Sequence, residues 1–111
     1  MPRIHSRFAI NIQAVFNWLC TVHGKQPGDI VLYGQSVGSG PSVHLAAAIS
    51  GLAGLVLHSP LVSGVRVLHP EWRHWPAWAD VYPNQVLMPR VQCPTFVMHV
   101  RNAPILMCGV W

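Results

Sequence analysis

The segment IVLYGQSVGSGP, residues 30–41, carries in turn the signals of a strand, a sharp turn and a helix. Ile30-Val31-Leu32-Tyr33 is a run of strand formers bounded by glycines, which predicts a short buried strand. A helix is predicted from about Ser39 to Ile49, with Pro41 in its first turn, where the missing N–H costs nothing. The intervening Gly34-Gln35-Ser36-Val37-Gly38 has the Gly-x-Ser-x-Gly spacing of a nucleophile elbow, placed between Tyr33 and Ser39.

Such a turn presents its serine hydroxyl at the sheet edge and needs small flanking residues, which Gly34 and Gly38 provide. The N–H of Val37 opens the following helix, where a developing oxyanion is favoured by free N–H groups and by the helix dipole. The pattern therefore predicts Ser36 as a nucleophile and the Val37 N–H as an oxyanion donor. The alternative is a glycine-rich turn whose serine only caps the helix.

Nucleotide-binding loops use similar glycines but fit this segment less well. No lysine follows the glycines, so the phosphate-binding P-loop pattern fails. A dinucleotide fingerprint starting at Gly38 meets Val43 where its third glycine belongs, and the next strand ends in His58-Ser59 rather than in an acid. We expect no nucleotide or other cofactor.

Regular elements are predicted on both sides of this segment. Apolar residues at helical spacing predict a helix from about Ala9 to Val22, stopped by Gly24 and Pro27. Residues 55–58 and 95–100 are the second and third strand candidates. The proline-rich residues 61–92 predict an irregular segment with one short helix.

Composition narrows the class of protein. Only 9% of the 111 residues are charged, against about 25% in ordinary soluble domains, as expected for the interior of a larger α/β protein. A complete doubly wound enzyme usually needs roughly 200 residues or more. The net charge of +4 comes mainly from there being only three acids, and the seven basic residues are dispersed, so nucleic-acid binding is disfavoured.

The three cysteines, Cys20, Cys93 and Cys108, have no CxxC spacing, which argues against a disulfide framework and a zinc knuckle and favours a reducing compartment. No signal-peptide pattern follows Met1. The most apolar segment, residues 45–57, is shorter than the roughly 20 residues that span a bilayer. We therefore expect no transmembrane span.

Residues 30–41, together with Leu57-His58-Ser59-Pro60-Leu61-Val62-Ser63-Gly64-Val65-Arg66, resemble the alpha/beta-hydrolase domain-containing protein 17 family. The resemblance runs from about Ile10 to His99, and residues 100–111 diverge. It implies one partial α/β-hydrolase domain over residues 1–111, with a parallel sheet and flanking helices. Family members are serine hydrolases that remove palmitate from the cysteines of membrane-associated proteins. The resemblance thus implies a palmitoylated protein substrate, Ser36 attacking its thioester, and a cytoplasmic, membrane-associated location.

Several family features are missing from this sequence. Val100-Arg101-Asn102-Ala103 replaces the turn that supplies the triad acid, and no histidine or acid occurs after His99. The opening strands with the second oxyanion donor and the lipid-anchoring N-terminal cysteines are absent too. A serine without a base is a poor nucleophile at neutral pH, so we expect very low activity.

Other residues that could serve in catalysis, metal binding or acyl-chain binding are less well supported by the sequence. His58 is the histidine nearest to Ser36 in the predicted sheet, but the resemblance places it in a structural His-Ser-Pro turn. His44 and His99 are expected to be structural. His69, Glu71 and His74 lack the spacing of a zinc-binding histidine pair, so we expect no metal site. Three tryptophans at spacing three either line an acyl-chain groove or, as we favour, pack on the sheet: Trp72, Trp75 and Trp78.

Two hypotheses of different class remain. The first is a truncated serine hydrolase, most like a palmitoyl-protein thioesterase. The second is a non-catalytic, hydrolase-like remnant or isoform that at most binds a partner. The missing acid and histidine favour the second for this chain, which we also expect to be marginally stable because sheet edges and apolar faces are left open.

Overall fold

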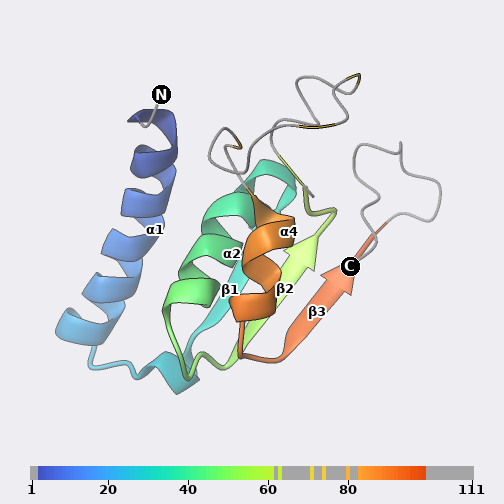
Figure 1. Cartoon of the computed structure of the whole chain (residues 1–111). Helices are drawn as coiled ribbons and strands as arrows, with labels where there is room; N and C mark the ends of the chain where they lie inside the picture. The colour runs from blue at the N-terminus through green and yellow to red at the C-terminus, as the bar shows by residue number, and fades with distance from the viewer. Residues whose placement is uncertain are drawn as a thin grey trace.

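A computed structural model of the chain describes residues 3–61, 63, 71, 74, 80 and 83–99, with side chains from Ala9 onward. Its elements follow one another as helix, strand, helix, strand, helix and strand, with short 3₁₀ turns between some of them (Figure 1). The helices are α1 (Arg3–Val22), α2 (Ser39–Ala48) and α4 (Asn84–Leu87), and the strands are β1 (Val31–Gln35), β2 (Gly54–His58) and β3 (Thr95–Met98).

The three strands form one parallel sheet in the order β1-β2-β3. Parallel neighbours need a crossover connection, and α2 supplies it between β1 and β2. The register pairs Gln35 with His58 and His58 with Met98, so all three strands end at one carboxyl edge. This confirms the α/β class with a parallel sheet and flanking helices, consistent with part of an α/β-hydrolase fold.

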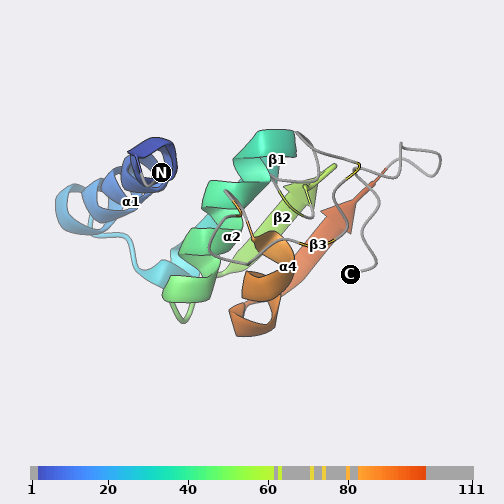
Figure 2. The same cartoon turned by 45° about the horizontal axis from the view of Figure 1, so that its top comes forward.

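Helix α2 packs on one face of the sheet and lies between α1 and α4 (Figures 1 and 2). The core forms where α2 meets this face. Val43 and Leu45 of α2 pack with Leu55 and Leu57 of β2, and all four are at most 2% exposed. Phe16 extends the core to α1.

Element bounds differ from the sequence-based predictions in places. Helix α1 begins at Arg3 rather than Ala9, because residues 3–8 contain no glycine or proline to stop it and Ile4 and Phe8 continue the four-residue apolar spacing that leads to Ile12. Strand β1 includes Gly34 and Gln35, whose pairing with Leu57 and His58 outweighs the low strand propensity of glycine. Strand β3 ends at Met98, before the predicted end at Val100.

In the described part of the irregular segment, the short helix α4 is followed by a 3₁₀ turn at Met88–Arg90, in keeping with the prediction of a short helix in residues 61–92. The tryptophans Trp72, Trp75 and Trp78 lie outside the described residues, as does His69. The choice between an acyl-chain groove and packing on the sheet therefore stays open.

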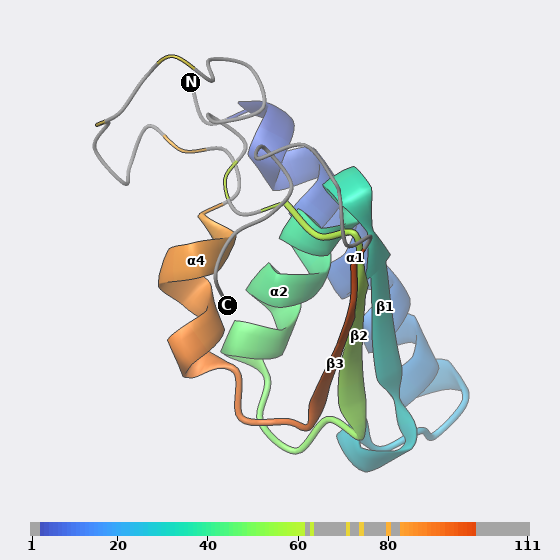
Figure 3. The ribbon, with the colours of Figure 1, turned by 90° about the vertical axis from the view of Figure 1, so that its right-hand side faces the viewer.

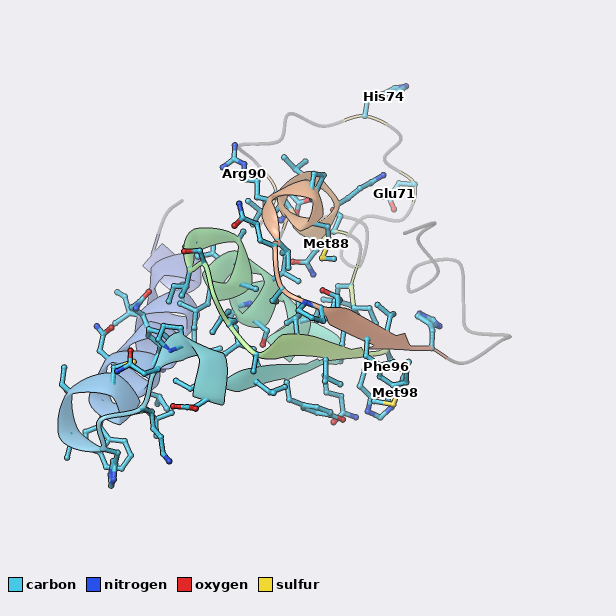
Figure 4. All side chains as sticks on the ribbon, turned by 90° about the horizontal axis from the view of Figure 1, so that it is seen from below. Glu71, His74, Met88, Arg90, Phe96 and Met98 are labelled. Atoms are coloured by element: carbon cyan, nitrogen blue, oxygen red, sulfur yellow. The ribbon has the colours of Figure 1, made fainter. Side chains whose placement is uncertain are left out.

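The second face of the sheet carries exposed apolar side chains. The prediction of a buried strand at residues 30–33 is therefore wrong for one face of β1, whose residues alternate between exposed and buried because the described helices lie on the other side. One cross-strand row consists of Tyr33, Val56 and Phe96, of which Tyr33 is 57% and Phe96 61% exposed. Figure 3 shows the sheet from its edge, with α2 and α4 together on one side. In Figure 4, Phe96 and Met98 point away from the side that holds Met88. We call this second face, with Val31, Tyr33, Val56, His58, Phe96 and Met98, the open face.

Replacing an apolar residue of the open face should improve solution behaviour without loss of the fold. In Phe96→Lys, the lysine replaces a side chain that is already mostly in water, so the free energy of unfolding should change by about 0.5 kcal/mol or less while concentration-dependent association falls. Light scattering and urea unfolding measure the two quantities. Leu55→Lys is the matched control, because Leu55 is 1% exposed and its replacement should unfold the chain. Unfolding of Phe96→Lys would contradict the assignment of the open face.

Candidate active site

Ser36 occupies the bend between β1 and α2. It follows Gln35, the last residue of β1, and opens a 3₁₀ turn, Ser36–Gly38, that continues into α2. Its backbone φ is 50°, in the left-handed region that residues other than glycine seldom adopt. The side chain is half-buried. Ser36 therefore lies at the carboxyl edge of the sheet, outside the regular part of both elements.

The bend is tight because the chain folds back onto Gly34. A Cβ at Gly34 would lie 2.8 Å from the Gly38 oxygen, the Ser39 Cα and the Ser42 Oγ, which is closer than real Cβ atoms approach. At Gly38, in contrast, a Cβ would meet no described atom within 4 Å. The prediction that a small residue is needed is thus confirmed for Gly34, while the space beside Gly38 is open.

The first turn of a helix has N–H groups without partners inside the helix, and it carries the positive end of the helix dipole. Val37 and Gly38 lie where such groups are expected, directly after Ser36. Val37 is 55% exposed, so its surroundings are open to a ligand. This arrangement is suited to binding negative charge next to the Ser36 hydroxyl.

His58 lies opposite Gln35 in the sheet but is engaged elsewhere. Its Nδ1 is 2.9 Å from the hydroxyl of Tyr33, and the two rings meet edge to face, with centroids 6.4 Å apart. Both side chains belong to the open face. Within the described ranges no histidine is hydrogen-bonded to the Ser36 hydroxyl.

The remaining histidines and acids are spread over the molecule. His23 packs against Trp18 at the end of α1, His44 is exposed on α2, and His99 follows β3. Asp29 precedes β1, at the opposite edge of the sheet from Ser36, and accepts a hydrogen bond from the Gln26 N–H. Asp80 accepts a hydrogen bond from the Ser63 hydroxyl.

In the portion of the chain that the structure describes, no three histidine, cysteine, aspartate or glutamate side chains lie close enough together to hold a metal ion. Glu71 and His74 lie on the long connection after β2, away from the strands (Figure 4). None of the described helices has both the length and the apolar character needed to cross a bilayer.

Two residues near Ser36 were not singled out from the sequence. The Ser39 hydroxyl donates to the Ser36 carbonyl oxygen, and Asn84 of α4 donates to the Ser39 hydroxyl. Both side chains are fully buried. Ser39 directly follows the Gly-x-Ser-x-Gly motif and could have been suspected, whereas no sequence signal connects it with Asn84, 45 positions away.

Comparison with known proteins gives a consistent set of relatives. The chain is 47% identical over 90 residues to the alpha/beta hydrolase domain-containing protein aho-3 of Caenorhabditis elegans. It is 37% identical over 89 residues to the alpha/beta hydrolase domain-containing protein 17B of Homo sapiens. It is 39% identical over 89 residues to the alpha/beta hydrolase domain-containing protein 17C of Mus musculus.

Each of these matches covers 80% of this chain but only 26–30% of the relative. No family model matches the chain, and no solved structure matches it. By its similarity to these proteins, the chain belongs to the alpha/beta hydrolase domain-containing protein 17 family, of which it spans between a quarter and a third of a member's length.

Proposed function

We propose that Ser36 is the nucleophile of a serine hydrolase that acts on acyl thioesters, and that the Val37 N–H is one donor of its oxyanion hole. The observation that carries the proposal is the position of Ser36, at φ 50° between the end of strand β1 and a helix start, next to the close approach at Gly34. The resemblance to the family gives the substrate class, a palmitoylated cysteine of a membrane-associated protein.

The chemistry requires few parts. The serine oxygen attacks the carbonyl carbon of the thioester, and negative charge develops on the carbonyl oxygen. N–H groups at a helix start stabilise that charge, because they are oriented before the reaction begins. The cysteine thiolate then leaves, and water releases the acyl group from the serine. No cofactor takes part in these steps.

The base is the part that this sequence does not supply. The last histidine of these 111 residues is His99, directly after β3, and the last acid is Asp80, so these residues contain neither the later histidine nor the later acid that the family resemblance implies. A serine hydroxyl stays protonated at neutral pH unless a base accepts its proton as the new bond forms. The proposal therefore assigns Ser36 an intrinsic acyl-accepting role with slow turnover in these 111 residues.

A non-catalytic role is the second candidate. The observation in its favour is that His58, the histidine opposite the end of β1, is hydrogen-bonded to Tyr33 rather than to Ser36. In this reading the chain is a hydrolase-like remnant that at most binds a partner.

Covalent labelling separates the two candidates. We expect a fluorophosphonate to label the chain slowly, and Ser36→Ala to abolish that labelling. Ser59→Ala is a matched control, because Ser59 also follows a strand and has a left-handed φ of 48°, so it should label at about the wild-type rate. Mass spectrometry of the digested protein locates the adduct. An unlabelled wild-type chain, or labelling that survives Ser36→Ala, would reject the catalytic role in favour of the remnant.

A further inference from the structure

The backbone at Ser36 needs something to hold it. A left-handed φ at a residue with a Cβ costs about 1–3 kcal/mol and persists only where the surroundings impose it. Gly34 leaves room for the bend, because it has no Cβ to meet the chain that folds back onto it. The restraint comes from Ser39, whose backbone N–H and side-chain hydroxyl both donate to the Ser36 carbonyl oxygen, the hydroxyl at 2.6 Å.

The Ser39 hydroxyl has no freedom to turn elsewhere. A hydroxyl has one proton to donate and two lone pairs to accept with. Its other two partners are the Leu61 N–H at 3.0 Å and the Asn84 Nδ2 at 3.1 Å, which can only donate. The single proton of the hydroxyl must therefore point at Ser36.

The orientation of Asn84 is fixed in the same way. Its Nδ2 donates one proton to Ser39 and the other to the Leu61 carbonyl oxygen at 2.7 Å. Exchanging the amide nitrogen and oxygen would set two acceptors, Oδ1 and the Leu61 oxygen, against each other. Asn84 thus joins the turn after β1 to the segment that leaves β2.

Asn84 makes these two bonds at a cost. The side chain is 0% exposed, and its Oδ1 has no hydrogen-bond partner within the described structure. A buried unpaired acceptor costs about 1–3 kcal/mol. An apolar side chain at this position would fill the core without burying an unpaired acceptor. An asparagine is explained if the fold needs the two N–H donors of its amide.

From these contacts we infer that Ser39 and Asn84 are positioning residues that hold the Ser36 peptide in its left-handed conformation. Asn84 fixes the Ser39 hydroxyl, and that hydroxyl fixes the Ser36 carbonyl group, which sets the direction of the Ser36 side chain. Their role as positioning residues rests on the proposed function, since it requires that the Ser36 hydroxyl reacts. The hydrogen-bonded restraint itself does not.

Asn84→Asp tests the inference, because aspartate has nearly the same size but replaces both donors with an acceptor. We expect the Leu61 amide to exchange its hydrogen about tenfold faster or more, which corresponds to about 1.4 kcal/mol and lies within the cost of disturbing a buried hydrogen bond. The amide chemical shifts of Ser36 and Val37 should move, while those of α1 stay in place. Fluorophosphonate labelling of Ser36 should fall at least about tenfold, compared at equal folded fraction. Gln85→Ala, on the exposed neighbour in α4, is the control and should change none of these values.

Ser39→Ala keeps the test decisive if Asn84→Asp does not fold, because it removes one oxygen atom and adds no charge. It should give the same pattern at Leu61, Ser36 and Val37. Unchanged amide shifts and exchange in a folded Asn84→Asp or Ser39→Ala protein would overturn the inference. The nuclear magnetic resonance readouts do not need Ser36 to react, so absence of wild-type labelling would reject the proposed function while leaving the restraint testable.

Discussion

Gly34→Ala should destabilise the chain by about 3 kcal/mol or more, the upper end of the cost of overpacking a core. The added Cβ would lie 2.8 Å from the Gly38 oxygen and the Ser39 Cα, which are backbone atoms and cannot turn aside as a side chain does. Relief requires opening the bend, and that moves Ser36 away from the sheet edge. Urea unfolding measures the loss as a lower midpoint.

Gly38→Ala is the matched control for this substitution. It makes the same chemical change four residues away, at φ −67°, where a Cβ meets no described atom within 4 Å. Alanine restricts the unfolded chain more than glycine does, so stability should rise by up to about 1 kcal/mol. Equal losses for Gly34→Ala and Gly38→Ala would contradict the close approach at Gly34.

Leu57→Ala should have the second large effect, a loss of about 2–5 kcal/mol. Leu57 is 0% exposed in the central strand and faces the helices, so its removal leaves a cavity between β2 and α2. The control is Val31→Ala, on the open face, where the side chain is 55% exposed and the change should stay within about 0.5 kcal/mol.

Unfolding midpoints of the two variants give the comparison. If Val31→Ala cost as much as Leu57→Ala, the assignment of one buried and one open sheet face would be refuted. This pair therefore tests the two-layer arrangement, whereas the glycine pair tests the turn.

Much of the fold could be predicted because its signals are local. The strand formers before Gly34 and the helix-compatible residues after Ser39 are neighbours in sequence, and so are the residues that end β2 at Ser59-Pro60. The predicted ends of these elements agree with the structure to within one or two residues. The start of α1 was missed, although Ile4 and Phe8 extend the four-residue apolar spacing back from Ile12 and nothing in residues 3–8 opposes a helix.

The parts of the site that escaped prediction depend on contacts between distant residues. Asn84 reaches Ser39 over 45 positions, and Tyr33 reaches His58 over 25. Neither pair has a motif, since a buried asparagine and a strand tyrosine each have many possible partners. The tertiary arrangement alone brings them together. The assignment of Ser36 and Val37 to catalysis and of residues 1–111 to one partial domain stays a prediction.

The conformation of Ser36 is the feature on which the account depends, and a crystal structure of the 111-residue chain measures it most directly. We expect Gln35 in extended backbone, Ser36 at φ near 50°, and α2 beginning at Ser39 with the Ser39 hydroxyl bonded to the Ser36 carbonyl oxygen. This expectation would be contradicted by a structure in which Ser36 lies inside a continuous helix, at a φ of about −60°. It would also be contradicted by a structure in which Ser36 lies on a segment that leaves the sheet.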